Sequence, residues 1–198
     1  MRFMSANYDF QGNFNIVAME SNVSYNLIKV GFAKQIKKIH YRDIPKHIER
    51  IQEQIKPDMT SLEINNQYAE RLLDLCRIKH NLDIKGLTIS ESNFEPQKEF
   101  DCIEQSTVLE WVFEKLESES MVLPSFGNIS PSMKKLSNQI NNMKRFYTLT
   151  QRSIHAPINR KNTNLFMALL SCCAIHMQSN YLYIPDTNKN LKTDNYGV

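Results

Sequence analysis

The segment from Thr163 to Gln178, TNLFMALLSCCAIHMQ, restricts the fold more than any other part of the chain. Between Leu165 and Met177 it contains no charged residue, and apolar side chains occupy every phase of a helix. A helix that is apolar all round must be enclosed by other elements. At about 13 residues it is too short to cross a bilayer, which needs about 20. We therefore expect it to be the central helix of a protein core.

Length and cysteine usage place the chain among ordinary globular proteins. Its 198 residues suit one domain, and 41% hydrophobic and 23% charged residues are usual values. The first residues lack the apolar run of a secretory signal, and no 18-residue apolar stretch follows. We therefore expect a cytoplasmic protein without a membrane span. In that compartment the cysteines would be free thiols: Cys76, Cys102, Cys172 and Cys173.

Hydrophobic periodicity and capping residues predict a mainly α protein. The stripe Ile44, Ile48, Ile51 and Ile55 indicates a helix, and Thr60 with Glu63 has the spacing of a capping box. The fold that we predict is a compact bundle of six or seven helices around the buried apolar helix at about 163–178, with a few short strands. The expected helices are 22–40, 44–55, 60–80, 96–117, 131–147 and 163–178, and the expected short strands 14–19, 87–90 and 181–184.

We expect residues 1–185 to form a single helical domain. Its first part, 1–20, would be loosely attached or form a short strand. The polar segment 186–198 would be a disordered tail, because most of its residues are Asn, Lys, Thr and Asp.

Charge is distributed unevenly although the net charge is only +3. Residues 61–120 carry six basic and thirteen acidic residues, whereas 121–185 carry seven basic and no acidic residue. We favour neutralisation of the basic ends by the acidic middle within one fold. The alternative is an acidic partner, in which case the basic faces 29–46 and 134–161 would bind the phosphate backbone of a nucleic acid. The candidate binding residues are Lys34, Lys37, Lys38, Arg42, Lys134, Lys135, Lys144, Arg145 and Arg152.

Two Cys-x-x-x-His pairs are a candidate metal site. Cys76 and His80 share one helical face, as do Cys172 and His176, so each pair offers a thiolate and an imidazole. If the two helices faced each other, the four side chains would make a tetrahedral zinc site. The simpler interpretation is a set of buried cysteines and a core histidine, and we expect no cofactor.

Arg42 and His47, within the sequence RDIPKH, suggest a possible catalytic pair. This pattern resembles the R-polar-x-x-x-H signature of HEPN-type helical ribonucleases. The resemblance covers six residues and implies a metal-independent ribonuclease in which both side chains face the scissile phosphate.

The leading hypothesis is a helical protein-binding module, an adaptor, scaffold or effector, whose partner is another protein. The sequence contains no complete catalytic set and none of the common nucleotide-binding or hydrolase motifs. Its expected contact surface is the methionine-containing seam of Met133, Leu136, Ile140, Met143 and Tyr147, since methionine-rich faces adapt to several partners. Nucleic-acid binding is the alternative function. The Asn-, Ile- and Lys-rich composition is typical of an AT-rich genome.

Overall fold

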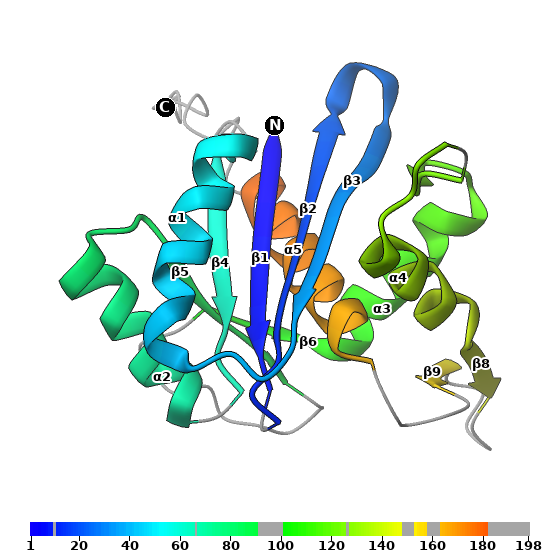
Figure 1. The fold of residues 1–198 in the computed structure, drawn as a ribbon. Helices are drawn as coiled ribbons and strands as arrows, with labels where there is room; N and C mark the ends of the chain where they lie inside the picture. The colour runs from blue at the N-terminus through cyan, green and yellow to red at the C-terminus, as the bar shows by residue number, and fades with distance from the viewer. Residues whose placement is uncertain are drawn as a thin grey trace, which may run out of the picture.

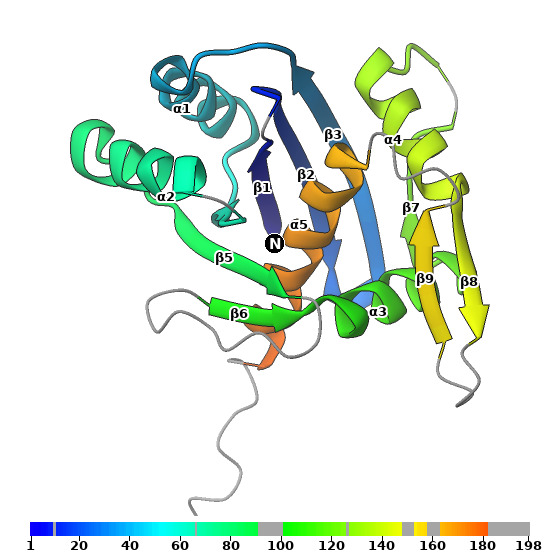
Figure 2. The same cartoon turned by 90° about the horizontal axis from the view of Figure 1, so that it is seen from below.

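A computed structural model describes residues 1–9, 11–65, 67–90, 101–125, 127–147, 153–157 and 163–181, without the side chains of 90, 144–147, 153–157, 180 and 181. The fold is a seven-stranded mixed sheet with helices on both faces (Figures 1 and 2). The prediction of a mainly α bundle is therefore wrong. No helix of the described part is long and apolar enough to cross a membrane.

The strands of the main sheet follow the order β6-β5-β4-β1-β2-β3-β7. The pairs β1–β2 and β2–β3 are antiparallel, and all other neighbours are parallel. A two-stranded antiparallel sheet, β8–β9, lies apart from it. The strands are β1 (Arg2–Tyr8), β2 (Phe14–Asn22), β3 (Leu27–Ile36), β4 (Met59–Glu63), β5 (Lys85–Ser90), β6 (Asp101–Glu104), β7 (Met121–Val122), β8 (Met143–Tyr147) and β9 (Ser153–Pro157). The helices are α1 (Ile44–Ile55), α2 (Gln67–Asp74), α3 (Gln105–Glu117), α4 (Pro131–Asn141) and α5 (Asn164–Tyr181).

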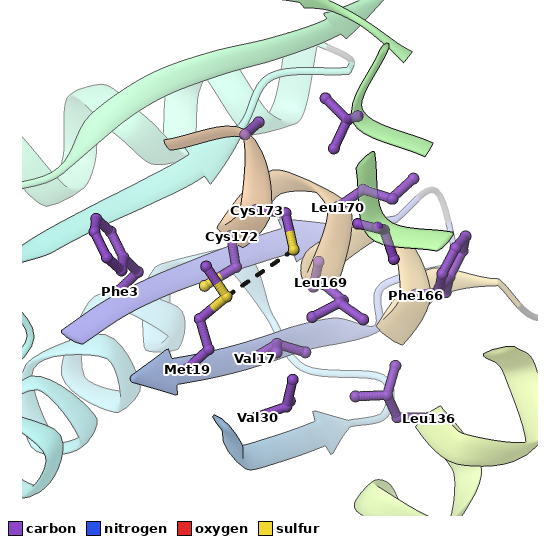
Figure 3. Packing of buried hydrophobic residues seen from close by; sticks show 14 of the residues in the cluster. Phe3, Val17, Met19, Val30, Leu136, Phe166, Leu169, Leu170, Cys172 and Cys173 are labelled. Atoms are coloured by element: carbon purple, nitrogen blue, oxygen red, sulfur yellow. Dashed lines mark hydrogen bonds between the residues drawn. The ribbon is translucent and has the colours of Figure 1, made fainter. Parts of the chain in front are cut away.

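Helix α5 lies across one face of the sheet and is covered by α3 and α4 (Figure 2). Leu169, Cys172 and Cys173 are completely buried, and the Cys173 Sγ lies 4.0 Å from the Met19 Sδ of β2 (Figure 3). The prediction of an enclosed central helix is confirmed. Its neighbours are mainly a sheet and not a ring of helices, since α5 packs on β1 and β2.

The opposite face of the sheet is covered by α1 and α2. Ile44, Ile48 and Ile51 are buried there, as the isoleucine stripe predicts, and Pro45 occupies the first turn of α1. The predicted helix at 44–55 is confirmed.

The predicted helix at 22–40 is wrong, because residues Leu27–Ile36 form β3. Ala18 pairs with Phe32 and Met19 with Val30, so Gly31 is an extra residue in a β-bulge. The bulge shifts the buried positions from Val30 to Ala33. This shift breaks the alternation of a strand and imitates helical spacing.

Three further segments differ from the sequence prediction. Residues Thr60 to Glu63 belong to β4, since the alternation of this segment also suits a strand beside β1. The expected seam at 133–147 is divided: α4 ends at Asn141, and Met143 begins β8. In the expected helix 96–117, residues 101–104 are β6, 105–117 are α3, and 96–100 lie outside the described residues.

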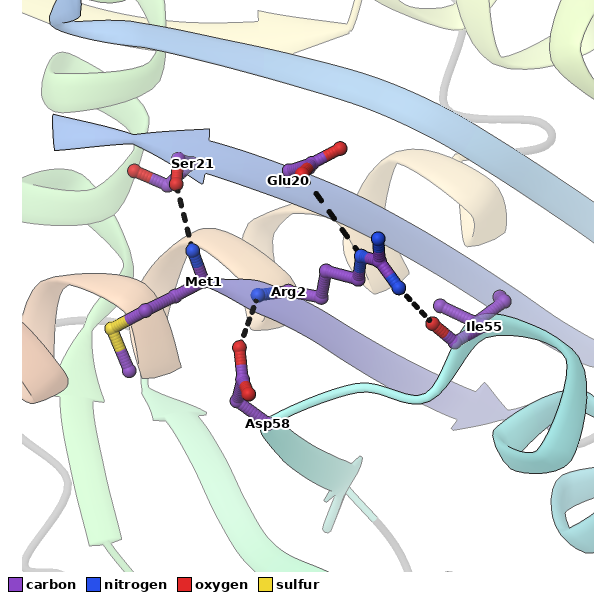
Figure 4. Close-up of polar contacts among 6 residues, drawn as sticks. All are labelled: Met1, Arg2, Glu20, Ser21, Ile55 and Asp58. Carbon is purple, nitrogen blue, oxygen red and sulfur yellow. Dashed lines mark hydrogen bonds and ion pairs between the residues drawn. The ribbon is translucent and has the colours of Figure 1, made fainter. Parts of the chain in front are cut away.

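The N-terminal segment is not loosely attached, because β1 and β2 form the centre of the sheet, and the expected short strand at 14–19 lies within β2. The Met1 amino group donates to the Ser21 carbonyl oxygen at 2.9 Å, and the Arg2 amide donates to Asp58 Oδ2 at 2.7 Å (Figure 4). The Arg2 side chain also donates to the Ile55 carbonyl oxygen at 3.2 Å. The amino end of β1 is thus tied to β2 and to the segment before β4. The expected strand 181–184 and the tail 186–198 lie outside the described residues, except for Tyr181 in α5.

Candidate functional site

Polar side chains line the sheet beneath α5, where β1 and β4 run side by side. The register pairs Ser5 with Ser61, and alternation directs Asn7 and Glu63, two residues further along, to the same face. The Ser61 hydroxyl donates to Ser5 Oγ at 2.9 Å, and Asn7 Nδ2 donates to Glu63 Oε2 at 2.6 Å. All four residues are buried. Such a buried polar row is unusual in a core, and it makes this part of the sheet a candidate functional site.

Glu63 is the only acidic residue that is fully buried in the described part of the chain. Its Oε2 also accepts a hydrogen bond from the Ser171 hydroxyl of α5, at 3.3 Å. Burial raises the pKa of Glu63, and the hydrogen bonds from Asn7, Ser171 and Asn65 oppose that rise. The carboxyl group therefore holds its proton to a higher pH than an exposed glutamate does.

Asp9 follows β1 and organises the turn that leads to β2. Its carboxylate accepts hydrogen bonds from the Gln11 and Asn13 amides and from Asn13 Nδ2, each at 2.9 Å. It also accepts one from Asn164 Nδ2, at the first residue of α5. The turn requires Gly12, which has a φ of +77°. Asp9 therefore joins the start of α5 to the end of β1.

These residues lie at one end of the sheet, which we call the carboxyl end. It comprises Asn7 to Asp9 at the end of β1, Gln35 to Lys38 at the end of β3, and Glu63 at the end of β4. Helices α1, α4 and α5 begin here, since α1 follows β3, Ser132 of α4 bonds to Gln35, and Asn164 bonds to Asp9. The amino ends of helices carry partial positive charge.

A chain of hydrogen bonds places a lysine beside this end. Lys135 Nζ donates to Gln35 Oε1 at 2.8 Å, and Gln35 Nε2 donates to the buried Asn15 at 2.7 Å. Burial and the neighbouring Lys37 lower the pKa of Lys135, and Asp9 acts in the opposite direction. Lys37, Lys135 and Asp9 are therefore close enough to influence one another electrostatically.

A shallow groove of about 580 Å³ opens between the end of β3 and the start of α1. Its lining contains four cationic side chains, one histidine and a single acidic residue, Asp43. The charged lining residues are Lys37, Lys38, Asp43, Lys46 and Arg50, with His47 among them. With Lys135 of α4, which lies beside Gln35 and Lys37, the four cations form a set that we call the basic rim: Lys37, Lys38, Lys46, Arg50 and Lys135.

Of the binding residues predicted from the sequence, the structure brings together Lys37, Lys38 and Lys135. Lys34 lines a separate pocket beside Ser132 and Met133, and Lys134 lies in the first turn of α4. The described residues form two ion pairs, Arg2–Glu20 and Glu114–Lys115, and neither includes a residue of the basic rim. Residues 91–100, part of the acidic middle of the sequence, lie outside the described residues, so the expected neutralisation stays a prediction. The side chains of Lys144 and Arg145, in β8, lie outside the described residues, as does Arg152.

Arg42 and His47 do not form a pair. The Arg42 Nε donates to the Tyr41 hydroxyl at 3.3 Å, and its guanidinium carbon lies 5.8 Å from the centre of that ring. His47 faces the basic groove, which Arg42 does not line. A HEPN-type ribonuclease is a helical bundle, so the seven-stranded sheet excludes this interpretation.

The four residues of the proposed zinc site lie on opposite faces of the sheet. Cys76 packs with α1 and α2, whereas Cys172 packs beneath α5 on the other side. Burial raises the pKa of Cys76 to about 12 and lowers that of His176 to about 4. His176 Nε2 lies 2.8 Å from Ser21 Oγ, as expected of a core histidine. Among the described residues, no three or more His, Cys, Asp or Glu side chains form a group that could hold a metal ion.

Sequence reasoning missed Asn7, Asp9, Glu63, Asn164 and Ser171. A usable signal for Glu63 was present in the alternation of Met59 to Glu63, which suits a strand as well as a capping box. The other members offered no local signal, because Asp9 and Asn164 are 155 positions apart.

Comparison with known proteins shows similarity in structure only. No family model and no curated protein sequence matches the chain. The large terminase nuclease from thermophilic phage G20c with bound cobalt has a TM-score of 0.59 and 9% identity, over 88% of this chain and 80% of that one. The large terminase nuclease domain from bacteriophage SPP1 with bound Mn has a TM-score of 0.60 and 10% identity, over 89% and 86%.

The human cytomegalovirus terminase nuclease domain, soaked with Mn and bound to an inhibitor, has a TM-score of 0.56 and 14% identity, over 88% and 82% of the two chains. These similarities show the ribonuclease H-like α/β fold of terminase nuclease domains. The hypothesis of a helical protein-binding module is therefore wrong, because the helical bundle on which it depends does not exist.

Proposed function

We propose that this domain binds DNA, and that the DNA lies against the carboxyl end of the sheet. The observation that carries the proposal is the basic rim, whose five cationic side chains border that end, with Asp43 as the single acidic residue of the groove and no described ion pair to a rim cation. The structural similarity to terminase nuclease domains supports it. This surface is not the pair of basic faces, 29–46 and 134–161, that the sequence predicted. Its residues come from the end of β3 and the starts of α1 and α4.

The charge and exposure of the rim suit a phosphate backbone. Lys37, Lys38, Lys46 and Arg50 are exposed and line one groove, so they can reach neighbouring phosphates without leaving buried cations unpaired. Each phosphate that a lysine or arginine neutralises releases condensed counterions, which favours binding at low salt. The amino ends of α1, α4 and α5 add partial positive charge at the same end. These contacts would be independent of base sequence.

A divalent metal does not fit the donor set of the carboxyl end. Solved terminase nucleases contain bound cobalt, magnesium or Mn. Magnesium and manganese favour carboxylate oxygens. Here Glu63 is a single buried carboxyl group with a raised pKa, and Asp9 is saturated by hydrogen bonds within its own turn and from α5. The described residues therefore support binding of DNA, and we derive no hydrolytic step from them.

The test is DNA binding by the double variant Lys37→Ala/Lys38→Ala, measured by fluorescence anisotropy with a labelled duplex at several salt concentrations. We expect the variant to bind more weakly at every duplex sequence. The slope of log K against log salt should become shallower by about 1 to 2, because each lysine that contacts a phosphate contributes about 0.9.

The matched control is Lys29→Ala/Lys56→Ala, which removes the same charge from exposed positions near the other end of the sheet. Lys29 lies on β3 roughly 25 Å from Lys37, at about 3.3 Å per residue. Equal loss of affinity and of salt dependence in the two double variants would show that the rim has no special role, and would refute the proposed surface.

A further inference from the structure

We propose that Asn7 and Asn164 block a divalent cation, because their side-chain amides donate hydrogen bonds to the Glu63 and Asp9 carboxylate oxygens that would otherwise coordinate it. The domain therefore holds DNA without hydrolysing it. This inference rests on the proposed function, and it adds a specific reason why the carboxyl end binds and does not cut. Each of the two carboxyl groups has its own amide donor: Asn7 Nδ2 for Glu63, at 2.6 Å, and Asn164 Nδ2 for Asp9.

The Glu63 carboxyl group is closed to a cation by its surroundings. Oε2 accepts from both Asn7 and Ser171, and Ser171 belongs to the helix that covers the sheet here. Only 2% of Glu63 is exposed, so a hydrated cation has no direct approach to it. Burial also favours its protonated form, which is a poor ligand for magnesium or manganese.

The Asp9 carboxylate is equally committed, although it is partly exposed. Both of its oxygens accept two hydrogen bonds: Oδ1 from the backbone of Gln11 and Asn13, and Oδ2 from the side chains of Asn13 and Asn164. These bonds hold the turn between β1 and β2. A metal ion at Asp9 would have to displace them and loosen that turn.

The charge around the site also favours an anion over a cation. Lys37 and Asp9 both lie near Lys135, since Lys37 lowers the pKa of Lys135 whereas Asp9 raises it. Two of these three side chains are lysines and one is an aspartate, so the formal charge of the group is positive. A phosphate group is attracted by this arrangement, whereas a divalent cation is repelled.

Asn7 is the position where the smallest chemical change would make the site favour a cation. Replacement by aspartate preserves the size of the side chain but places a carboxylate within hydrogen-bond distance of Glu63. Two carboxylates at that distance must share a proton or bind a cation between them. The unpaired and buried Asn7 Oδ1 shows that the pocket already places a potential ligand oxygen there, among the described residues.

The experiment measures Mn²⁺ binding by isothermal titration calorimetry, and the cleavage of duplex DNA with Mg²⁺ or Mn²⁺, for wild type, Asn7→Asp, Glu63→Gln and Asn22→Asp. Asn22→Asp is the charge-matched control, because Asn22 is exposed at the other end of β2. We expect wild type and Asn22→Asp to show neither saturable Mn²⁺ binding nor cleavage. Asn7→Asp should gain a stoichiometric Mn²⁺ site and a rise of Tm with Mn²⁺ that the wild type lacks.

Stoichiometric Mn²⁺ binding or metal-dependent cleavage by the wild type, lost in Glu63→Gln, would overturn the inference and leave DNA binding intact. A folded Asn7→Asp variant without Mn²⁺ binding would also overturn it, since the amide would then not be the obstacle. If Asn7→Asp does not fold, the wild-type and Glu63→Gln measurements still decide. Failure of the wild type to bind DNA in the anisotropy assay would instead refute the proposed function.

Discussion

Replacement of Glu63 by glutamine isolates the effect of burying an ionisable group beneath α5. Glutamine has nearly the same size, so the substitution leaves no cavity. A glutamine that places its amide oxygen where Glu63 has Oε2 keeps the hydrogen bonds from Asn7 Nδ2 and from the Ser171 hydroxyl. These two hydrogen bonds beneath α5 are therefore retained. The main difference between the two proteins is that glutamine cannot ionise.

The sign and the size of the effect follow from the direction of the pKa shift. The pKa of Glu63 in the folded protein lies above its ordinary value of 4.5, so the folded state keeps the proton over a pH range in which the unfolded state has lost it. The stabilising contribution is complete below about pH 4.5 and decreases as the pH rises toward the folded pKa. The decrease is about 1.4 kcal/mol for each pH unit in that window. Total stabilities of about 5–15 kcal/mol make such a change measurable.

The assay is urea denaturation of wild type and Glu63→Gln at pH 4, 6 and 8. We expect similar free energies of unfolding at pH 4 and a growing advantage of the glutamine variant toward pH 8. Contributions of other titrating groups cancel in the difference between the two proteins. A difference that stays constant from pH 4 to pH 8 would mean that Glu63 ionises as easily in the folded state as in the unfolded state, and the reasoning would fail.

Two further predictions concern α5. Leu169→Ala should lower the free energy of unfolding by about 2–5 kcal/mol, because Leu169 is completely buried. The control Val122→Ala, at a position 37% exposed, should lower it by less than about 0.5 kcal/mol. Equal effects of the two substitutions in denaturant titrations would contradict the packing of α5. Burial, the N-terminal ammonium and Lys115 lower the pKa of His176 to about 4, so its stabilising contribution should be complete above about pH 6.5 and fall by roughly 3 kcal/mol as the pH approaches 4. An NMR titration that gives His176 a pKa near 6.5 would be inconsistent with this environment.

The elements that the sequence predicted well are those with a long and uninterrupted period. The isoleucines of α1 and the apolar run of α5 belong to this class. Each pattern can be recognised from one segment of the sequence, without knowing which other segment packs against it. The strands were harder to identify. In β3 a bulge at Gly31 displaces the buried positions by one residue, and in β4 the segment from Thr60 to Glu63 satisfies a helix-capping pattern equally well.

The candidate site was predicted only where it depends on charge. Clusters of lysine are visible in any sequence, and the predicted Lys37, Lys38 and Lys135 do meet at the carboxyl end. Asn7 and Glu63 are 56 positions apart, and their contact exists only because β1 and β4 are neighbours in the sheet. With the strand order unknown, an asparagine in one segment gives no indication that it will meet a glutamate in another.

The contact between Asp9 and Asn164 has a consequence for the order of folding. It joins residues 155 positions apart, and so does the contact of Ser21 with His176. During synthesis, β1, β2 and β4 leave the ribosome long before α5, and the apolar face of the sheet that α5 covers stays exposed to water until then. Chains rich in such distant contacts fold slowly and are prone to aggregate while incomplete. A chain that stops before residue 164 would therefore expose an apolar surface that molecular chaperones recognise. Such a chain would remain bound by chaperones, because only α5 covers that surface.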